Sequence, residues 1–100
     1  MQREEILKLI DEELIRAESK WPDYYSDIIH ASGLINEEAG ETMAASLDYT
    51  YDNGSIDEVV SKTIQTAAMC FRLLQNLRKL KAVQSFVESG GKQLTIDNGI

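Results

Sequence analysis

The stretch LINEEAGE, residues 34–41, lies inside a long helical pattern and sets two carboxylates at helical spacing. Glu38 and Glu41 are three residues apart, so on a helix they share one face, with Leu34 beside them and His30 two turns earlier. Acidic side chains among apolar neighbours are costly to bury unless they are paired or bound to a cation. We therefore expect both to point into a cleft between this helix and the next. A solvated stripe of acids is the commoner arrangement, and the stretch alone does not separate the two.

Upstream of this stretch, residues 2–19 are predicted to form an amphipathic helix. Its apolar positions recur at spacings of four and three, at Ile6, Ile10, Leu14 and Ala17. The helix is expected to end near Trp21-Pro22, because the residue before a proline is biased away from helical angles. The second helix is expected to begin near Pro22-Asp23, since proline is well placed in a first turn.

Downstream, the turn signal Asp52-Asn53-Gly54 separates the second helix from a third. Ser55 and Glu58 have the spacing of a capping box, in which each side chain accepts a hydrogen bond from the other residue's backbone N–H. The third helix is predicted to reach at least Arg78. The apolar pattern that follows either continues it or forms a short fourth helix after a bend. Gly90-Gly91 is expected to end that segment, as glycine does at helix C-termini.

No segment shows the pattern of a β-strand, so the predicted fold is all-α, a bundle of three to four helices joined by hairpins. We expect one domain over residues 1–90 and a C-terminal tail over 91–100 that is loose or bound to a partner. Helices of about 25 residues would be about 38 Å long, whereas a domain of this size has a radius of gyration of about 13 Å. Such helices overhang a monomer's core, which predicts a homodimer or tetramer whose subunits complete one another's bundle.

The composition is that of an ordinary globular protein, with 43% hydrophobic and 27% charged residues. The formal net charge of -7 argues against a nucleic-acid polymer as partner, but it is compatible with a small anion bound through a divalent metal. The single cysteine, Cys70, excludes a disulfide within the chain, and we expect no catalytic role for it. Without an apolar run of membrane-spanning length or a signal-peptide core, we expect no membrane partner and a cytoplasmic setting.

Three segments of the chain form a recognisable pattern. The first is the run EEAGE, residues 37–41, in which Glu38 and Glu41 make an E-x-x-E pair. The others are an R-x-x-x-K-W run, formed by Arg16, Lys20 and Trp21, and the third-helix run QTAAMCFRLL, residues 65–74. In this order and at helical spacing, the three segments resemble the MazG-like all-α nucleoside triphosphate pyrophosphatases, especially the short phage and bacterial members.

The resemblance covers roughly residues 14–78 and implies cleavage of a nucleoside triphosphate to a monophosphate and pyrophosphate. Family members hold Mg²⁺ between E-x-x-E on one helix and E-x-x-D on the next, which would make Glu38 and Glu41 metal ligands and catalytic residues. Mg²⁺ prefers oxygen ligands, so carboxylates on facing helices suit it. The positions expected to contact the nucleotide are Arg16, Lys20, Trp21, Lys62 and Arg72.

The chain departs from the family pattern where the second acidic pair should stand, because Lys62 and Gln65 occupy those positions. Gln65 offers a carbonyl oxygen to a metal, but a protonated lysine cannot bind one, and we expect Lys62 to pair with Glu38 or Glu41. Glu58, one turn before Lys62, is the remaining acidic ligand for a shifted metal site. The departure predicts weak or absent Mg²⁺ binding. It leaves open a degenerate member that binds a nucleotide or a protein partner, or acts as an oligomeric scaffold, without turnover.

Each of these residues also has a purely structural interpretation. Trp21 could be only the apolar anchor of a turn, and His30 only a packed or surface residue. Arg72 could pair with an acid across a helix interface, and Met43 and Met69 are predicted to be core. An unrelated acidic helical interaction domain would also have this composition, but it leaves the tryptophan and the glutamate pair unexplained.

Overall fold

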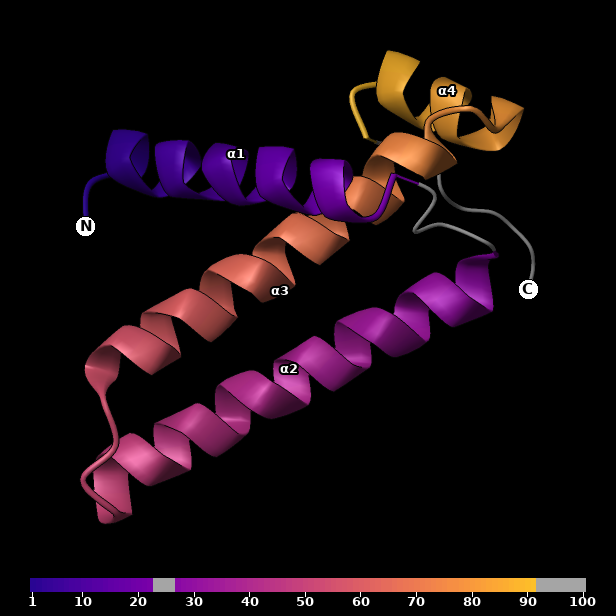
Figure 1. Ribbon diagram of the computed structural model, residues 1–100. Coiled ribbons are helices and arrows are strands. Elements are labelled where there is room, and N and C mark those ends of the chain that lie inside the picture. The colour runs from indigo at the N-terminus through magenta and orange to yellow at the C-terminus, as the bar shows by residue number, and fades with distance from the viewer. Residues whose placement is uncertain (23–26, 92–100) are drawn as a thin grey trace.

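The computed structural model describes residues 1–22 and 27–91, which form four α-helices and contain no strand (Figure 1). The helices are α1 (Arg3–Lys20), α2 (Ile28–Tyr51), α3 (Ile56–Leu77) and α4 (Lys81–Glu88). The helices α2 and α3 pack side by side as an antiparallel hairpin, α1 packs against α3, and α4 extends from the C-terminal end of α3. The predicted all-α fold is therefore confirmed.

The start of α2 is set by an aspartate rather than by the proline. Asp27 has an extended backbone, and its carboxylate accepts a hydrogen bond of 2.7 Å from the N–H of His30, as a helix N-cap does. The predicted start near Pro22-Asp23 is wrong for this reason, since the backbone at Asp27 is not helical. Residues 23–26 of that prediction lie outside the described ranges.

The third helix begins and ends close to its predicted limits. Ser55 caps it, but its hydroxyl accepts from the N–H of Asp57 at 3.0 Å, and among the described residues the Ser55 N–H donates no return bond to the Glu58 carboxylate. The helix ends at Leu77, and the apolar pattern that follows forms the separate short helix α4. The glycines after α4 both have positive φ angles, +74° and +83°, which confirms that they end this segment.

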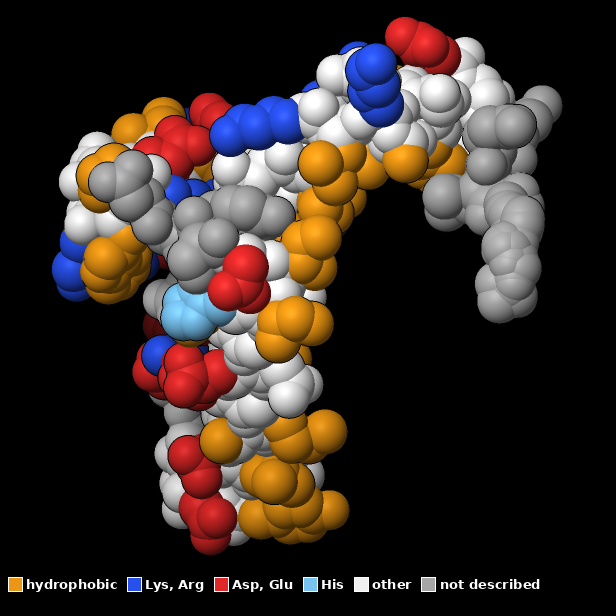
Figure 2. Space-filling view, turned by 90° about the vertical axis from the view of Figure 1, so that its right-hand side faces the viewer, with side chains coloured by type: hydrophobic (Ala, Val, Ile, Leu, Met, Phe, Trp, Pro, Cys, Tyr) orange, Lys and Arg blue, Asp and Glu red, His pale blue; other side chains and the backbone are white. Residues whose placement is uncertain are grey.

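The buried core is small and contains few large side chains. Its hydrophobic members are Leu14, Ala17, Ala31, Ala45 and Ala68, and no large side chain of the described residues is fully buried. Met43 is 61% exposed, so its prediction as a core residue is wrong. Figure 2 shows hydrophobic side chains gathered along one side of the molecule, and the radius of gyration is 16.1 Å. The helices thus leave much apolar surface uncovered, as their length predicted.

Two further sequence predictions concern the chain end and membranes. The predicted tail over residues 91–100 lies, apart from Gly91, outside the described residues. Among the residues that the structure describes, none of the helices combines the length and the apolar character needed to span a membrane.

Candidate functional site

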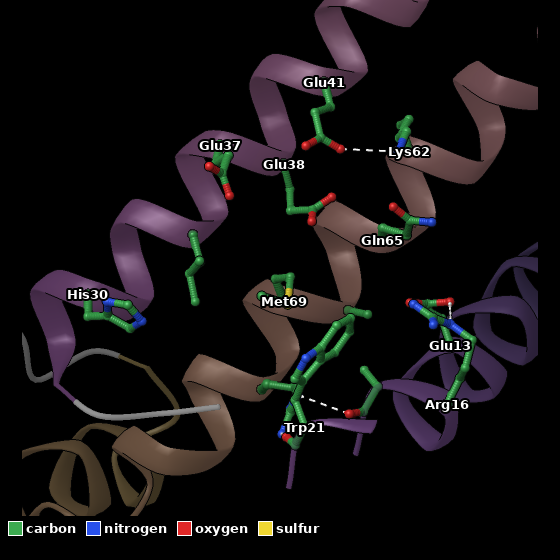
Figure 3. A pocket seen from close by; sticks show the side chains of 14 residues that line it. Glu13, Arg16, Trp21, His30, Glu37, Glu38, Glu41, Lys62, Gln65 and Met69 are labelled. Carbon is green, nitrogen blue, oxygen red and sulfur yellow. Dashed lines mark hydrogen bonds and ion pairs between the residues drawn. The ribbon is translucent and has the colours of Figure 1, made fainter. Parts of the chain in front are cut away.

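A pocket of about 470 Å³ opens between α1, α2 and α3 (Figure 3). Most of the predicted site residues line it, and they come from all three helices: Arg16, Trp21, Glu38, Glu41, Lys62, Gln65 and Arg72. Apolar side chains, those of Leu34, Ala68 and Met69, form another part of the wall, and His30 also lines it. The pocket has the size of a small-molecule site and combines an apolar surface with a few polar groups.

The register of the α2–α3 hairpin places the polar residues opposite one another. The hydroxyls of Thr42 and Thr66 lie 3.1 Å apart, and one donates to the other across the hairpin. Small side chains at this contact allow the helices to approach closely, with Ala45 buried beside it. Glu38 and Glu41 on α2 consequently face Lys62 and Gln65 on α3, as Figure 3 shows.

Glu41 and Lys62 form an ion pair across this contact. The Nζ atom of Lys62 lies 3.1 Å from Oε1 of Glu41, which confirms the predicted pairing. The hydrogen bond to the carboxylate raises the pKa of the Lys62 ammonium. The Glu41 side chain is 45% exposed, so it lies at the rim of the pocket rather than inside it. The prediction of a cleft position therefore holds only in part for Glu41.

Glu38 lies deeper than Glu41, and one of its oxygens has no partner. Its Oε1 atom is buried, and no hydrogen-bond donor among the described residues reaches it. Burial raises the pKa of this carboxyl, and the neighbouring Glu41 carboxylate raises it further, whereas the charge of Lys62 lowers it. A buried acceptor without a donor costs free energy, so the ionised Glu38 side chain destabilises the folded chain.

The α1 side of the pocket carries an aromatic ring between cations. The Trp21 side chain is 50% exposed, with the ammonium of Lys20 at 4.6 Å and the guanidinium of Arg16 at 5.9 Å from its ring centroid. Arg16 also makes a two-point contact with Glu13, with distances of 2.6 and 2.9 Å, which raises the pKa of the guanidinium. Sequence reasoning missed Glu13, although its i, i+3 spacing from Arg16 was a usable signal.

Arg72 holds the end of α1 against α3. It is only 5% exposed, and its guanidinium donates to the backbone oxygen of Trp21 at 2.6 Å and to that of Ala17 at 3.5 Å. These carbonyls belong to the last turn of α1, where a cation also suits the helix dipole. These backbone carbonyls are partners of Arg72 that the sequence did not predict, and the guanidinium holds the backbone of Trp21.

The structure does not bring Glu58 together with Glu38. Glu58 lines a second pocket of about 260 Å³, which shares Glu41 and Lys62 with the first but not Glu38. No group of three or more His, Cys, Asp or Glu side chains is arranged to hold a metal ion in the described part of the chain. The Lys62 ammonium lies 3.1 Å from the Glu41 carboxylate, so one of the two predicted carboxylate ligands is paired with a cation.

The assembled pocket combines the Trp21 ring, an apolar wall and the side chains of Glu38 and Gln65, and it is large enough for a small molecule. Each cationic side chain around the pocket lies against a carboxylate, the Trp21 ring or a backbone carbonyl, so the cations do not form one positive cluster. None of the protein-family models, curated proteins or solved structures with which the chain was compared matches it.

Proposed function

We propose that this chain binds a nucleoside triphosphate or a related nucleotide in the pocket between α1, α2 and α3, with slow turnover or none. The observation that supports this most is the convergence on a single pocket of about 470 Å³ of Trp21, which directly follows α1, Glu38 of α2 and Lys62 of α3. An aromatic ring, an apolar wall and a few polar groups are the usual components of a site for a base and its attached phosphate.

Within this proposal, Trp21 stacks on the base and the nearby lysine attracts phosphate. The indole is half exposed at the pocket, and Lys20 carries its ammonium 4.6 Å from the ring centroid. Arg72 supports the site indirectly, because its guanidinium holds the backbone of Trp21. This role differs from the phosphate contact that the sequence suggested for it.

Slow turnover follows from the ion pair on the α2–α3 hairpin. The resemblance to all-α nucleoside triphosphate pyrophosphatases implies a Mg²⁺-dependent cleavage to monophosphate and pyrophosphate. Here Lys62 neutralises Glu41 at 3.1 Å, so fewer anionic ligands remain for a metal. The Glu38 carboxyl lines the pocket outside this ion pair, which favours residual hydrolysis as a second candidate function.

We further propose that the chain associates with a second copy of itself. Among residues 1–22 and 27–91, Leu14 is the only large member of the buried hydrophobic core, and a core of that size stabilises a domain poorly. Large apolar side chains on the hairpin remain about half exposed or more, among them Leu47, Tyr51, Ile56, Phe71 and Leu74. A second copy presents the same apolar surface and would cover it in a two-fold dimer.

Calorimetric titration with the common nucleoside triphosphates, with and without Mg²⁺, tests the binding proposal. We expect saturable binding that needs no metal and is lost in Trp21→Leu. Tyr49→Leu is the matched control, because Tyr49 is an equally exposed aromatic residue of α2 outside the pocket. Pyrophosphate release is measured on the same samples and should be slow. If no triphosphate binds at millimolar concentration, the proposal is wrong.

A further inference from the structure

The short helix α4 carries an apolar face that its own chain leaves partly uncovered. Val83, Phe86 and Val87 recur at spacings of three and four, so they share one face, and Val87 is 47% exposed. Of the described helices, only α1, α2 and α3 pack extensively on one another, and α4 projects from the end of α3 (Figure 1). Because a helix of 8 residues is marginal in water, it needs an apolar surface to pack on.

The apolar surface of the molecule runs from α4 along the hairpin of α2 and α3. Figure 2 shows hydrophobic side chains beneath the arm that α4 forms and down the same side of the molecule. Exposed apolar residues lie at both ends of the hairpin, with Phe71 and Leu74 near α4, and Leu47, Tyr51 and Ile56 beside the turn. A second copy on this surface can lie in a two-fold dimer with its hairpin parallel or antiparallel to the first.

The charges at the two ends of the hairpin are opposite. Exposed cations lie where α3 ends and α4 begins, at Arg78, Lys79 and Lys81. Exposed acids surround the α2–α3 turn, at Asp48, Asp52, Asp57 and Glu58. Among residues 1–22 and 27–91, none of these side chains forms an ion pair. A parallel dimer would bring the two basic ends together, whereas an antiparallel dimer places each basic end on the partner's acidic turn.

We propose that α4 is an arm that packs on the α2–α3 turn of a second copy in an antiparallel two-fold dimer. Its apolar face covers the exposed apolar side chains beside that turn, and the cations at its start pair with the acids there. The inference rests on the proposed self-association and adds to it which surfaces meet and in which orientation. Because the dimer is two-fold, the contact forms twice, and any substitution in it acts twice.

Charge reversal on the full chain tests the orientation, with the dissociation constant of the dimer measured by sedimentation equilibrium. Lys79→Glu with Lys81→Glu should raise this constant at least about tenfold, because acids then meet acids. Asp48→Lys with Asp52→Lys should do the same, and these residues lie at the C-terminal end of α2, where a lysine suits the helix dipole. The variant with all four changes should return to within about threefold of the original, because the pairs form again with exchanged signs.

Two controls separate the arm from unspecific effects of charge and polarity. Arg3→Glu with Lys8→Glu reverses two exposed cations of α1 and should leave the dissociation constant unchanged. Val87→Asn should raise the constant about tenfold, because it puts an amide on the apolar face of the arm. Ser85→Asn, at an exposed position of α4 off that face, should not change it.

The outcomes distinguish this inference from the self-association on which it rests. A dimer that becomes tighter when Lys79 and Lys81 are reversed would show that the basic ends meet, as in the parallel arrangement. A dimer that is indifferent to all of these changes would show that α4 takes no part in it. Either result overturns the inference and leaves the self-association in place, whereas a chain that stays monomeric at micromolar concentration contradicts both.

Discussion

Lys62 of α3 pairs with Glu41 of α2, with 3.1 Å between Nζ and Oε1. The contact lies on the wall shared by the two pockets of the hairpin, so it separates Glu38 on one side from Glu58 on the other. A lysine here supplies a fixed positive charge where the family pattern would place a carboxylate. We propose that the pair limits how far the acidic residues of α2 act together on a cation.

Arg72→Met is expected to destabilise the fold by about 2–3 kcal/mol, because it removes a charged donor from buried carbonyls. Trp21, whose backbone oxygen it holds, is the only tryptophan of the chain. Its emission therefore reports directly on release of the α1 end during urea unfolding. Arg3→Met, at an exposed position, should change stability by less than about 0.5 kcal/mol. An Arg72→Met protein as stable as the original would show that the guanidinium does not hold α1.

Glu38→Gln is expected to raise the melting temperature near pH 7 but not near pH 4. Burial raises the pKa of Glu38, so folding favours its protonated form. The stability that this preference adds to the fold is complete below the ordinary pKa of a glutamate. It is lost as the pH rises through the pKa that Glu38 has in the folded state. At neutral pH the ionised carboxylate is thus a cost that glutamine removes. Thermal unfolding followed by circular dichroism at both pH values measures this, and an equal gain at both would refute the assignment.

Self-association predicts that light scattering at micromolar concentration gives at least twice the chain mass of 11.2 kDa. Leu74→Lys should shift the protein toward the monomer, because Leu74 is a large apolar residue of α3 that is 64% exposed. Gln75→Lys introduces the same charge at the next, also exposed, position and should leave the mass unchanged. A monomer mass for the original chain would count decisively against the proposed dimer.

The helices could be predicted because their signals are local. Apolar spacing, the Asp52-Asn53-Gly54 turn and the glycines after α4 each act within a few residues, and the structure follows them. The start of α2 was misplaced because two capping signals compete there. Pro22 suits a first turn, but the Asp27 carboxylate reaches the N–H of His30 and prevails.

The sequence could predict only those parts of the site that depend on one helix or on one pair of residues from neighbouring helices. The pairing of Lys62 with Glu38 or Glu41 was predicted from the helix register that the resemblance implies, and the structure shows the pair with Glu41. The role of Arg72 was not predictable, because it depends on where α1 crosses α3, some fifty residues away along the chain. The exposure of Met43 was missed for a related reason, since a helix pattern shows which face is apolar but not which face the fold covers.

The most direct test of the proposal that Lys62 weakens Mg²⁺ binding compares the original chain with the Lys62→Glu, Gln65→Asp double variant. Calorimetric titration and pyrophosphate release are measured on both proteins. We expect weak or undetectable Mg²⁺ binding and slow release for the original chain. Both should rise by at least about tenfold in the variant, because a repelling cation is replaced by a second carboxylate pair. Tight Mg²⁺ binding and rapid release by the original chain, unchanged in the variant, would contradict the assignment of Lys62 as the residue that closes the site.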